Sequence, residues 1–332
     1  MARIVAAFGT SHSIMLTSQR EDWQHGFREL DPRNPHYFDR AGKPVTYEQL
    51  LAAAPADARD MVTPAKMSER FDRVQAAIAE LRERIQAARL DALLVVGDDQ
   101  AELFRLSTMP ALAIYYGQTI RNAAAEVSPA DPWYKKARMR RHEPDGERDY
   151  PVHGRLAEWL VRALSDREFD VTAMNGLEPG RFEGHAFQFV HRSYLQDSGV
   201  PVVPVILNTF DPPNQPTPRR CVQLGAALRE LLAAYPEDLR VGLIASGGLS
   251  HFVVDEDLDH GVIRAIRDKD TDWLAGLDPL QLQSGSSEIR NWLTVAEAAK
   301  GLELDWVSYT PAYRTPALTG TGLCFASWKT LP

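Results

Sequence analysis

The stretch DALLVVGDDQ, residues 91–100, joins five consecutive apolar residues to a glycine, two acids and an amide. A short apolar run that does not alternate with polar residues is typical of a strand buried on both faces. Glycine and polar residues directly after such a run mark the end of the strand and the start of a loop. The stretch therefore predicts a central strand in a sheet that helices cover on both sides.

Other short apolar runs have the same form, and helical patterns lie between them. The runs are Ile4–Phe8, Val202–Leu207 and Val241–Ile244. From Ser68 to Leu90 apolar residues recur every three or four positions, which predicts a helix with Ser68 as its N-cap. Shorter helices are expected at Tyr47–Ala54, Leu156–Leu164 and Val222–Ala233. This alternation predicts an α/β fold, a central, mostly parallel sheet flanked by helices, in a single domain over residues 1–332.

Two long segments, residues 21–64 and 126–150, are polar and irregular apart from the helix expected at Tyr47–Ala54. Loops of this length in a compact domain are usually functional covers or disordered segments, and we expect covering loops here. The most basic run, Lys135 to Arg141, lies in the second of them. It is either a solvated loop or a clamp for an anionic ligand.

The composition excludes several classes of function. The formal net charge of the 332 residues is -8 and the isoelectric point is about 5.6, whereas nucleic-acid binding needs a basic surface. The two cysteines, Cys221 and Cys324, form neither a disulfide framework nor a cysteine zinc site, so we expect two reduced, buried thiols. No apolar stretch reaches the ~18 residues of a membrane span, and the N-terminal run is too short for a signal peptide. A cytoplasmic protein without a membrane partner is expected.

Polar residues follow each of the four expected strands. They include His12, the pair Asp98 and Asp99, Asn208, and the Ser246–His251 segment. In open α/β sheets ligands bind outside the carboxyl ends of the strands, so these residues predict one shared crevice with a metal or an acid/base site. Glycine, serine and a single histidine are also ordinary turn residues after a strand. The residues alone leave both interpretations open.

Eight motifs, taken in their order and spacing, carry a family resemblance. They are GTSHS (9–13), VVGDDQAELF (95–104), FDVTAMNGL (169–177), GHAFQF (184–189), PVVPVILNTFDPP (201–213), RRCVQLG (219–225), ASGGLSH (245–251) and SSEIRNW (286–292). With them the sequence resembles the class III extradiol ring-cleavage dioxygenases of the protocatechuate 4,5-dioxygenase catalytic-subunit type. Within that group it is most similar to the 3-O-methylgallate dioxygenase-like branch.

The resemblance implies an Fe(II) site held by two histidines and a glutamate. His12 and Glu288 correspond to two of these ligands, and Gln100 stands where the family has its second histidine. Three arrangements stay open: Gln100 binds the iron, Asp99 or Glu102 replaces it, or the iron is lost. A neutral amide oxygen is a weaker donor to Fe(II) than imidazole.

The resemblance also implies roles around the metal. His251 is the expected acid/base residue, and His185 is expected to line the substrate pocket and to take part in catalysis. Asn208 and Ser250 are expected to bind substrate. The implied reaction is extradiol cleavage of a catechol- or gallate-type phenolic acid with O2. The alternatives are an oxygenase of the same fold acting on another aromatic compound, and a metal-poor paralogue that binds an aromatic ligand without catalysis. A homo-oligomer or a small helical partner subunit is compatible with the family.

Overall fold

The computed structural model describes residues 1–330. Its strands are β1 (Arg3–Thr10), β2 (Ala92–Asp98), β3 (Leu112–Tyr115), β4 (Thr119–Asn122), β5 (Arg148–Pro151), β6 (Thr172–Met174), β7 (Val202–Leu207), β8 (Arg240–Ser246), β9 (His251–Val253), β10 (Glu303–Tyr313) and β11 (Thr319–Lys329). Its α-helices are α1 (Phe27–Leu30), α2 (Tyr47–Ala53), α3 (Ala58–Met61), α4 (Pro64–Ala87), α5 (Trp133–Met139), α6 (Gly154–Ser165), α7 (His185–Val190), α8 (Pro218–Ala234), α9 (Glu256–Asp268), α10 (Thr271–Ala275) and α11 (Ile289–Ala298).

The central sheet has the strand order β10-β11-β1-β8-β2-β7-β3-β6, with β9 paired to β11. Its four middle strands, β1, β8, β2 and β7, are parallel neighbours. They contain the four apolar runs of the sequence, and the expected α/β fold is confirmed. Antiparallel pairs lie on both sides of this parallel centre, between β3 and β7 and between β11 and its neighbours. The small β4-β5 pair forms a separate sheet.

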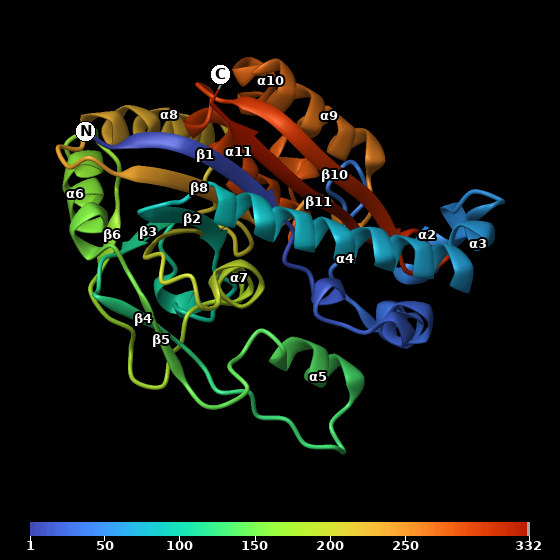
Figure 1. Cartoon of the computed structure of the whole chain (residues 1–332). Coiled ribbons are helices and arrows are strands. Elements are labelled where there is room, and N and C mark those ends of the chain that lie inside the picture. The colour runs from blue at the N-terminus through green and yellow to red at the C-terminus, as the bar shows by residue number, and fades with distance from the viewer. Residues whose placement is uncertain (331–332) are drawn as a thin grey trace.

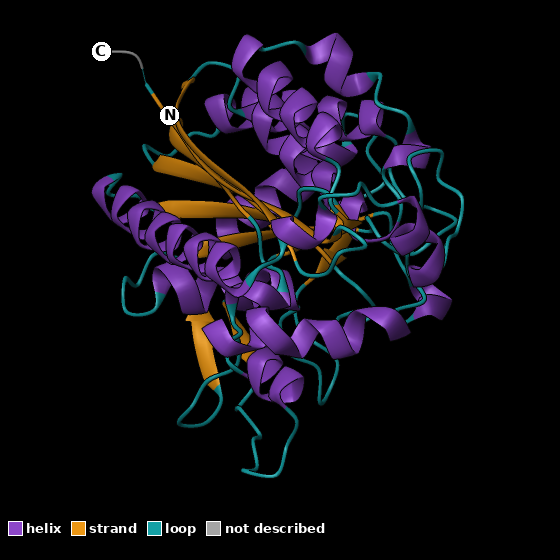
Figure 2. Cartoon of the chain, turned by 90° about the vertical axis from the view of Figure 1, so that its right-hand side faces the viewer, coloured by secondary structure: helices purple, strands orange, loops and turns teal. Residues whose placement is uncertain are grey.

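Helices cover both faces of the sheet, as Figures 1 and 2 show. One face is covered by the apolar sides of α6, α8, α9, α10 and α11. The other face is covered by α4 and α7. Neighbouring residues of β2 alternate between the two cores: Leu94 contributes to the first, and Leu93 and Val95 to the second. A strand whose successive side chains all enter a core must be apolar throughout, which explains the continuous run.

Helix α4 begins earlier than the sequence indicated. Its N-cap is Thr63, whose hydroxyl accepts a hydrogen bond from the backbone N–H of Lys66, and Pro64 occupies the first turn. Ser68, the expected N-cap, lies inside the helix. Proline at the first helical position needs no N–H and has a helical φ, so the Thr63-Pro64 pair is the stronger start signal.

The two segments expected to be irregular hold more regular structure than predicted. Residues 21–64 contain α1, α2 and α3, and residues 126–150 contain α5. Cys221 and Cys324 are both buried and free, as expected. Across residues 1–330 no helix is both long enough and apolar enough to cross a membrane.

Candidate active site

Four side chains with metal-binding donor atoms meet at the carboxyl edge of the sheet. His12 follows β1, Asp98 ends β2, His185 opens α7 and Glu288 precedes α11. All four are buried, and one donor atom of each lies within 4.8 Å of the others. The strands and helices that carry them are far apart in the sequence, so the sheet topology itself assembles the cluster.

The spacing of the donor atoms suits ligands of one metal ion. The Nε2 atoms of His12 and His185 are 3.0 Å apart, and Glu288 Oε2 lies 3.2 Å from His12 Nε2. Two nitrogen ligands at right angles, each about 2.1 Å from a metal, are about 3 Å apart. The carboxylate of Asp98 lies 3.8 Å from each imidazole Nε2. Two imidazoles and a carboxylate therefore converge as neighbouring ligands would.

Hydrogen bonds determine which nitrogen of His12 carries a proton. The Ser246 hydroxyl donates its proton to the carbonyl of Ala186 at 2.8 Å, so it can only accept from His12 Nδ1 at 3.1 Å. His12 Nδ1 is therefore the protonated nitrogen, and Nε2 presents its lone pair to the cluster. Such an outer hydrogen bond is the usual way in which a ligating histidine is oriented.

His185 is oriented in the same way by an acid. Its Nδ1 lies 2.5 Å from Glu102 Oε2, which also accepts the backbone N–H of His185 at 2.9 Å. Burial opposes a charge on this imidazole, but the Glu102 carboxylate outweighs burial and raises the pKa of His185 to about 9. A metal ion would need the Nε2 lone pair of His185, so its binding would displace the proton that this raised pKa favours on the imidazole.

The two carboxylates of the cluster differ in charge preference. Burial alone would raise the pKa of Glu288, but His12 and His251 beside it hold that pKa well below its usual value. Burial and the neighbouring Glu288 both raise the pKa of Asp98. Glu288 is thus the fixed negative charge of the site, and its Oε2 also accepts the backbone N–H of Gly248 at 2.6 Å.

Gln100 reaches the cluster through its amide nitrogen. Its Nε2 donates to Asp98 Oδ2 at 3.1 Å and to Glu288 Oε1 at 3.3 Å. Gln100 thereby bridges the two acids, and the imidazole nearest His12 is that of His185, which the sequence placed in the substrate pocket. The direct role of Gln100 as a ligand stays a prediction.

The other acids considered as replacements face different partners. The carboxylate of Asp99 accepts the backbone N–H groups of Glu102, Leu103 and Phe104, so it closes the turn after β2. Glu102 binds His185 on the side away from the cluster. Asp98, the first acid of the Asp98-Asp99 pair, is the one that joins the cluster.

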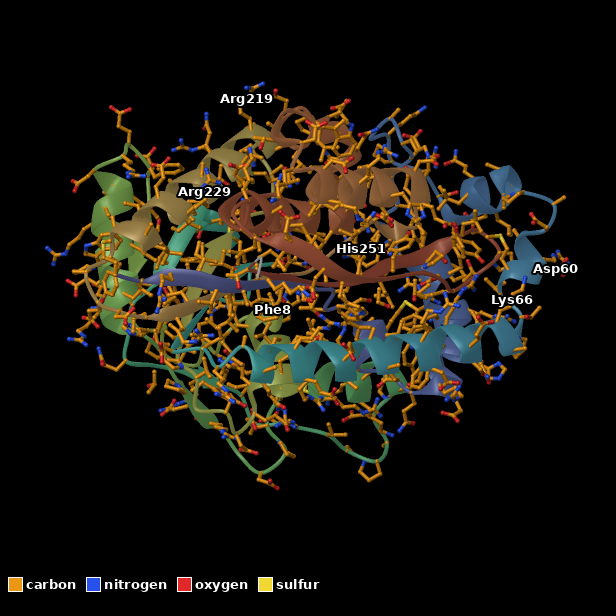
Figure 3. The ribbon with its side chains drawn as sticks, turned by 45° about the horizontal axis from the view of Figure 1, so that its top comes forward. Phe8, Asp60, Lys66, Arg219, Arg229 and His251 are labelled. Carbon is orange, nitrogen blue, oxygen red and sulfur yellow. The ribbon has the colours of Figure 1, made fainter. Side chains whose placement is uncertain are left out.

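His251 lies next to Glu288, with its Nε2 3.3 Å from Oε1. Its Nδ1 donates to the carbonyl of Leu249 at 2.9 Å, which leaves Nε2 to exchange a proton with the cavity. Burial favours the neutral imidazole, but Glu288 outweighs it and raises the pKa of His251. Figure 3 shows His251 near the middle of the molecule, far from Asp60 and Lys66 at its periphery.

Two residues expected to bind substrate are engaged elsewhere. The Asn208 amide donates to the Asp211 carbonyl and to Asn214 Oδ1, each at 2.7 Å, and accepts the backbone N–H of Asp211. The hydroxyl of Ser250 donates to Asp259 at 2.7 Å. Both side chains are hydrogen-bonded to other residues of the protein, and their role in substrate binding stays a prediction.

A cavity of about 570 Å³ opens above the cluster. The cluster side chains His12, His185 and Glu288 line it together with Gln100 and His251. Further lining residues are Arg138, Met139, Arg141, His142 and Gly180 to Glu183. The volume lies in the range of small-molecule sites, about 300–1,000 Å³. Four of these residues, Arg138, Met139, Arg141 and His142, belong to the 126–150 segment, whose role as a cover stays a prediction.

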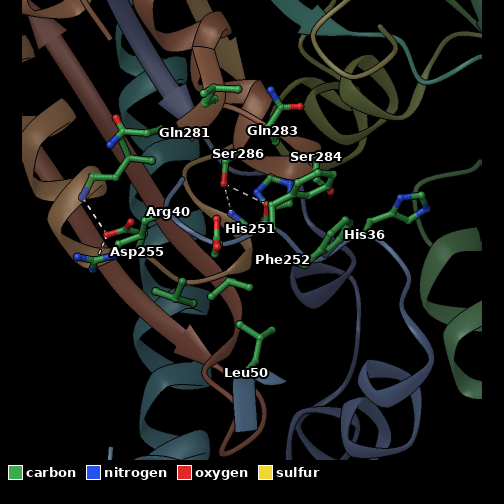
Figure 4. A pocket seen from close by; sticks show the side chains of 16 residues that line it. His36, Arg40, Leu50, His251, Phe252, Asp255, Gln281, Gln283, Ser284 and Ser286 are labelled. Carbon is green, nitrogen blue, oxygen red and sulfur yellow. Dashed lines mark hydrogen bonds and ion pairs between the residues drawn. The ribbon is translucent and has the colours of Figure 1, made fainter. Parts of the chain in front are cut away.

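A second cavity, of about 200 Å³, lies on the other side of His251. Figure 4 shows His251 and Phe252 on its wall, with Ser286 bonded to His251 and Arg40 paired with Asp255. Residues of the 21–64 segment, from His36 to Arg40, complete this cavity. His251 and Phe252 line both cavities and therefore separate them.

A buried acid holds the segment that carries His251. Asp259 accepts hydrogen bonds from the Ser250 N–H at 2.8 Å and from the Ser250 and Tyr309 hydroxyls at 2.7 Å. Burial outweighs these bonds and raises the pKa of Asp259 to about 7. An aspartate in an unfolded chain has a pKa of about 3.9. The folded protein therefore holds a proton between about pH 4 and pH 7 that the unfolded chain releases.

We expect Asp259→Asn to remove a pH dependence of stability. In the wild type, raising the pH through this window lowers the free energy of unfolding, because the unfolded chain binds fewer protons. The contribution approaches about 1.4 kcal/mol per pH unit at most. Urea unfolding of both proteins between about pH 5 and pH 7 measures it. Equal pH slopes in the two proteins would contradict the raised pKa of Asp259.

The fold and the cluster together define an α/β protein whose buried histidines and carboxylates could hold a metal ion, beside a cavity of small-molecule size. The sequence model of the family described as the catalytic LigB subunit of aromatic ring-opening dioxygenase matches residues 60–283. The chain belongs to this family. The matched range includes Asp98, Gln100, His185 and His251, whereas His12 and Glu288 lie outside it.

Characterised relatives are similar over parts of the chain. A gallate dioxygenase of Pseudomonas putida is 47% identical over 120 residues, which are 34% of this chain and 34% of that protein. A 2,3-dihydroxyphenylpropionate/2,3-dihydroxicinnamic acid 1,2-dioxygenase of Mycobacterium ulcerans is 26% identical over 189 residues, 57% of this chain and 52% of that protein. The protein of the same name from Mycolicibacterium vanbaalenii is 28% identical over 188 residues. The chain therefore spans 34% of the length of the gallate dioxygenase and 52% of the length of the Mycobacterium ulcerans protein.

Proposed function

We propose that this chain is an Fe(II)-dependent extradiol dioxygenase that opens the ring of a catechol- or gallate-type phenolic acid with O2. The observation that carries the proposal is the convergence of two imidazole Nε2 atoms 3.0 Å apart with the Glu288 carboxylate, on the floor of a cavity of about 570 Å³. Family membership and relatives named as dioxygenases of gallate and dihydroxyphenylpropionate support it.

The donor set fits ferrous iron. Two histidines and one carboxylate on one face of an ion are the ligands of non-haem Fe(II) oxygenases, which leave open positions for substrate and O2. We propose His12, His185 and Glu288 as these ligands, since the outer partners of both histidines leave the Nε2 lone pairs free. When bound, the iron would lower the pKa of the phenol and hold both reactants within reach.

The remaining residues position groups and move protons. Gln100 donates to both Asp98 and Glu288 and so restricts the orientation of the two carboxylates. His251 presents Nε2 to the cavity beside the cluster, where it can accept the proton of a substrate hydroxyl. Phe252 and Phe182 add apolar surface to the cavity walls, which suits an aromatic ring.

The proposal is tested by loading the protein with Fe(II) under nitrogen and then measuring O2 consumption with gallate, 3-O-methylgallate, protocatechuate and catechol. We expect one bound iron per chain, together with O2 uptake and loss of the aromatic absorption for at least one phenolic acid. Protein that binds the phenolic acids but neither retains iron nor consumes O2 would instead be a non-catalytic aromatic-binding paralogue.

Variants of His185 and Gln100 separate two possible ligand sets. If His185 is a direct ligand, His185→Ala weakens Fe(II) binding more than Gln100→Ala, for which the roughly 10- to 100-fold loss of an outer partner is expected. If the amide of Gln100 is the ligand instead, Gln100→His strengthens binding, because imidazole is the better donor. Anaerobic Fe(II) titration of the wild type and the three variants measures both effects. Unchanged affinity in His185→Ala would exclude His185 as a ligand.

A further inference from the structure

The larger cavity is lined by an arginine without an acidic partner. Arg141 follows α5 and lines this cavity together with Arg138 and His142. Its side chain is half-buried, and its one hydrogen bond is a long contact of 3.5 Å from Nε to the carbonyl of Arg138. Across residues 1–330 no acid forms an ion pair with it, although the charge of Glu102 favours the guanidinium most.

The backbone that presents Arg141 is well fixed. The amide of Asn122 donates to the carbonyl of Arg141 at 3.0 Å. The next acid, Glu143, is buried and accepts from the Tyr150 hydroxyl at 2.6 Å and from Arg192 at 3.1 Å. The guanidinium is therefore held at the cavity by an ordered segment, and burial lowers the pKa of Arg141 because water solvates the charge poorly.

The other arginines that line this cavity are either hydrogen-bonded to backbone carbonyls or exposed. Arg181 donates to the carbonyls of Ala101 and Glu102, at 3.2 and 2.7 Å. Arg138 is exposed at the rim. A guanidinium that is half-buried and lacks an anion leaves its donors free for a ligand, and its planar fork matches a carboxylate.

The cavity carries charges of both signs. Glu102 and Glu288 line it beside the buried Asp98, and Arg141 lines it from the segment after α5. A phenolic acid has the matching polarity, because its hydroxyl groups and its carboxylate project from opposite sides of the ring. If the proposed iron takes the ring hydroxyl groups, the carboxylate on the other side of the ring is left for the arginine.

We propose that Arg141 binds the carboxylate of the substrate and so selects phenolic acids over neutral catechols and pyrogallols. This rests on the proposed function for the class of substrate. It also assigns the basic run of residues 135–141 to anion binding at its last position, and leaves Arg138 as a rim residue. The predicted contact is a charge-assisted, bidentate hydrogen bond between the guanidinium and the ring-bound carboxylate.

The test compares the binding of gallate with that of pyrogallol, which lacks only the carboxylate. Calorimetry under nitrogen uses Fe(II)-loaded wild type, Arg141→Met and the control Arg140→Met, at an exposed arginine of the same run that does not line the cavity. We expect Arg141→Met to raise the Kd of gallate about 10- to 100-fold, the scale of a lost hydrogen bond between charged groups, and to leave that of pyrogallol unchanged. Arg140→Met should change neither Kd.

Two results would overturn the assignment: wild type that binds gallate no better than pyrogallol, or an Arg141→Met variant that weakens both ligands equally. Because binding is measured without O2, this test is independent of catalysis. Selective gallate binding that depends on Arg141, without O2 consumption, would support carboxylate binding by Arg141 and contradict the proposed dioxygenase activity. Ring cleavage in a protein whose gallate binding does not depend on Arg141 would support the activity and contradict the role of Arg141.

Discussion

Glu288→Ala is expected to remove the metal from the protein and abolish O2 consumption. Glu288 is the fixed negative charge of the cluster, since His12 and His251 hold its pKa well below the usual value. Asp98 is a poor substitute, because burial raises its pKa. We therefore expect a loss of Fe(II) affinity greater than the about 100-fold that an outer partner costs. Metal analysis after anaerobic loading and desalting gives the bound fraction.

A second substitution separates loss of the ligand from loss of structure. Glu288 also accepts the backbone N–H of Gly248, so alanine leaves that buried donor without a partner. Glu288→Gln keeps an oxygen for Gly248 and nearly the same volume but removes the charge. It should fold like the wild type by circular dichroism and still lose most of the metal. If both variants retained stoichiometric iron, Asp98 would be the carboxylate that the site depends on.

The central part of the fold was predictable because its strands are apolar on both faces. Buried parallel strands such as β2 read as continuous apolar runs, and their ends show as glycine and polar residues. The C-terminal hairpin of β10 and β11 gave no such signal. β10 is half-exposed along most of its length, and β11 contains Gly320 and Gly322, which disfavour a strand assignment.

Packing explains one of these glycines. A Cβ on Gly322 would collide with the carboxylate of Asp259, so a side chain there would displace the acid that holds Ser250. A local propensity argument cannot include this contact, because Asp259 lies on α9, far away in the sequence. Gly322 lowers the intrinsic strand propensity of β11, but it leaves the space that the Asp259 carboxylate occupies.

The site was predictable only in part for a related reason. Residues at strand ends, such as His12 and Asp98, could be expected to meet once the strands were taken as parallel neighbours. His185 comes from the start of α7, and no periodicity shows that this helix end returns to the carboxyl edge of β2. Ser250 and Asn208 also follow strands, but which way a side chain turns in a loop depends on hydrogen bonds such as those to Asp259 and Asp211.

His251→Phe is expected to retain the metal and slow turnover by about 100-fold or more, the usual scale for losing a general acid or base. His251 Nδ1 is bound to the Leu249 carbonyl, so only Nε2 can exchange a proton with a substrate in the cavity. Phenylalanine fills similar space against Gly285, which the imidazole contacts closely. Because the proposed ligands are His12, His185 and Glu288, the variant keeps them all.

The matched control is His36→Phe, which removes a histidine from the wall of the smaller cavity without contacting the cluster. Its turnover should equal that of the wild type, so the two variants differ only in whether the lost imidazole faces the site. Steady-state kcat at saturating substrate, with iron content measured on the same samples, makes the comparison. Unchanged kcat in His251→Phe would assign His251 a structural role, since Leu249, Ser286 and Glu288 already hold it between the two cavities.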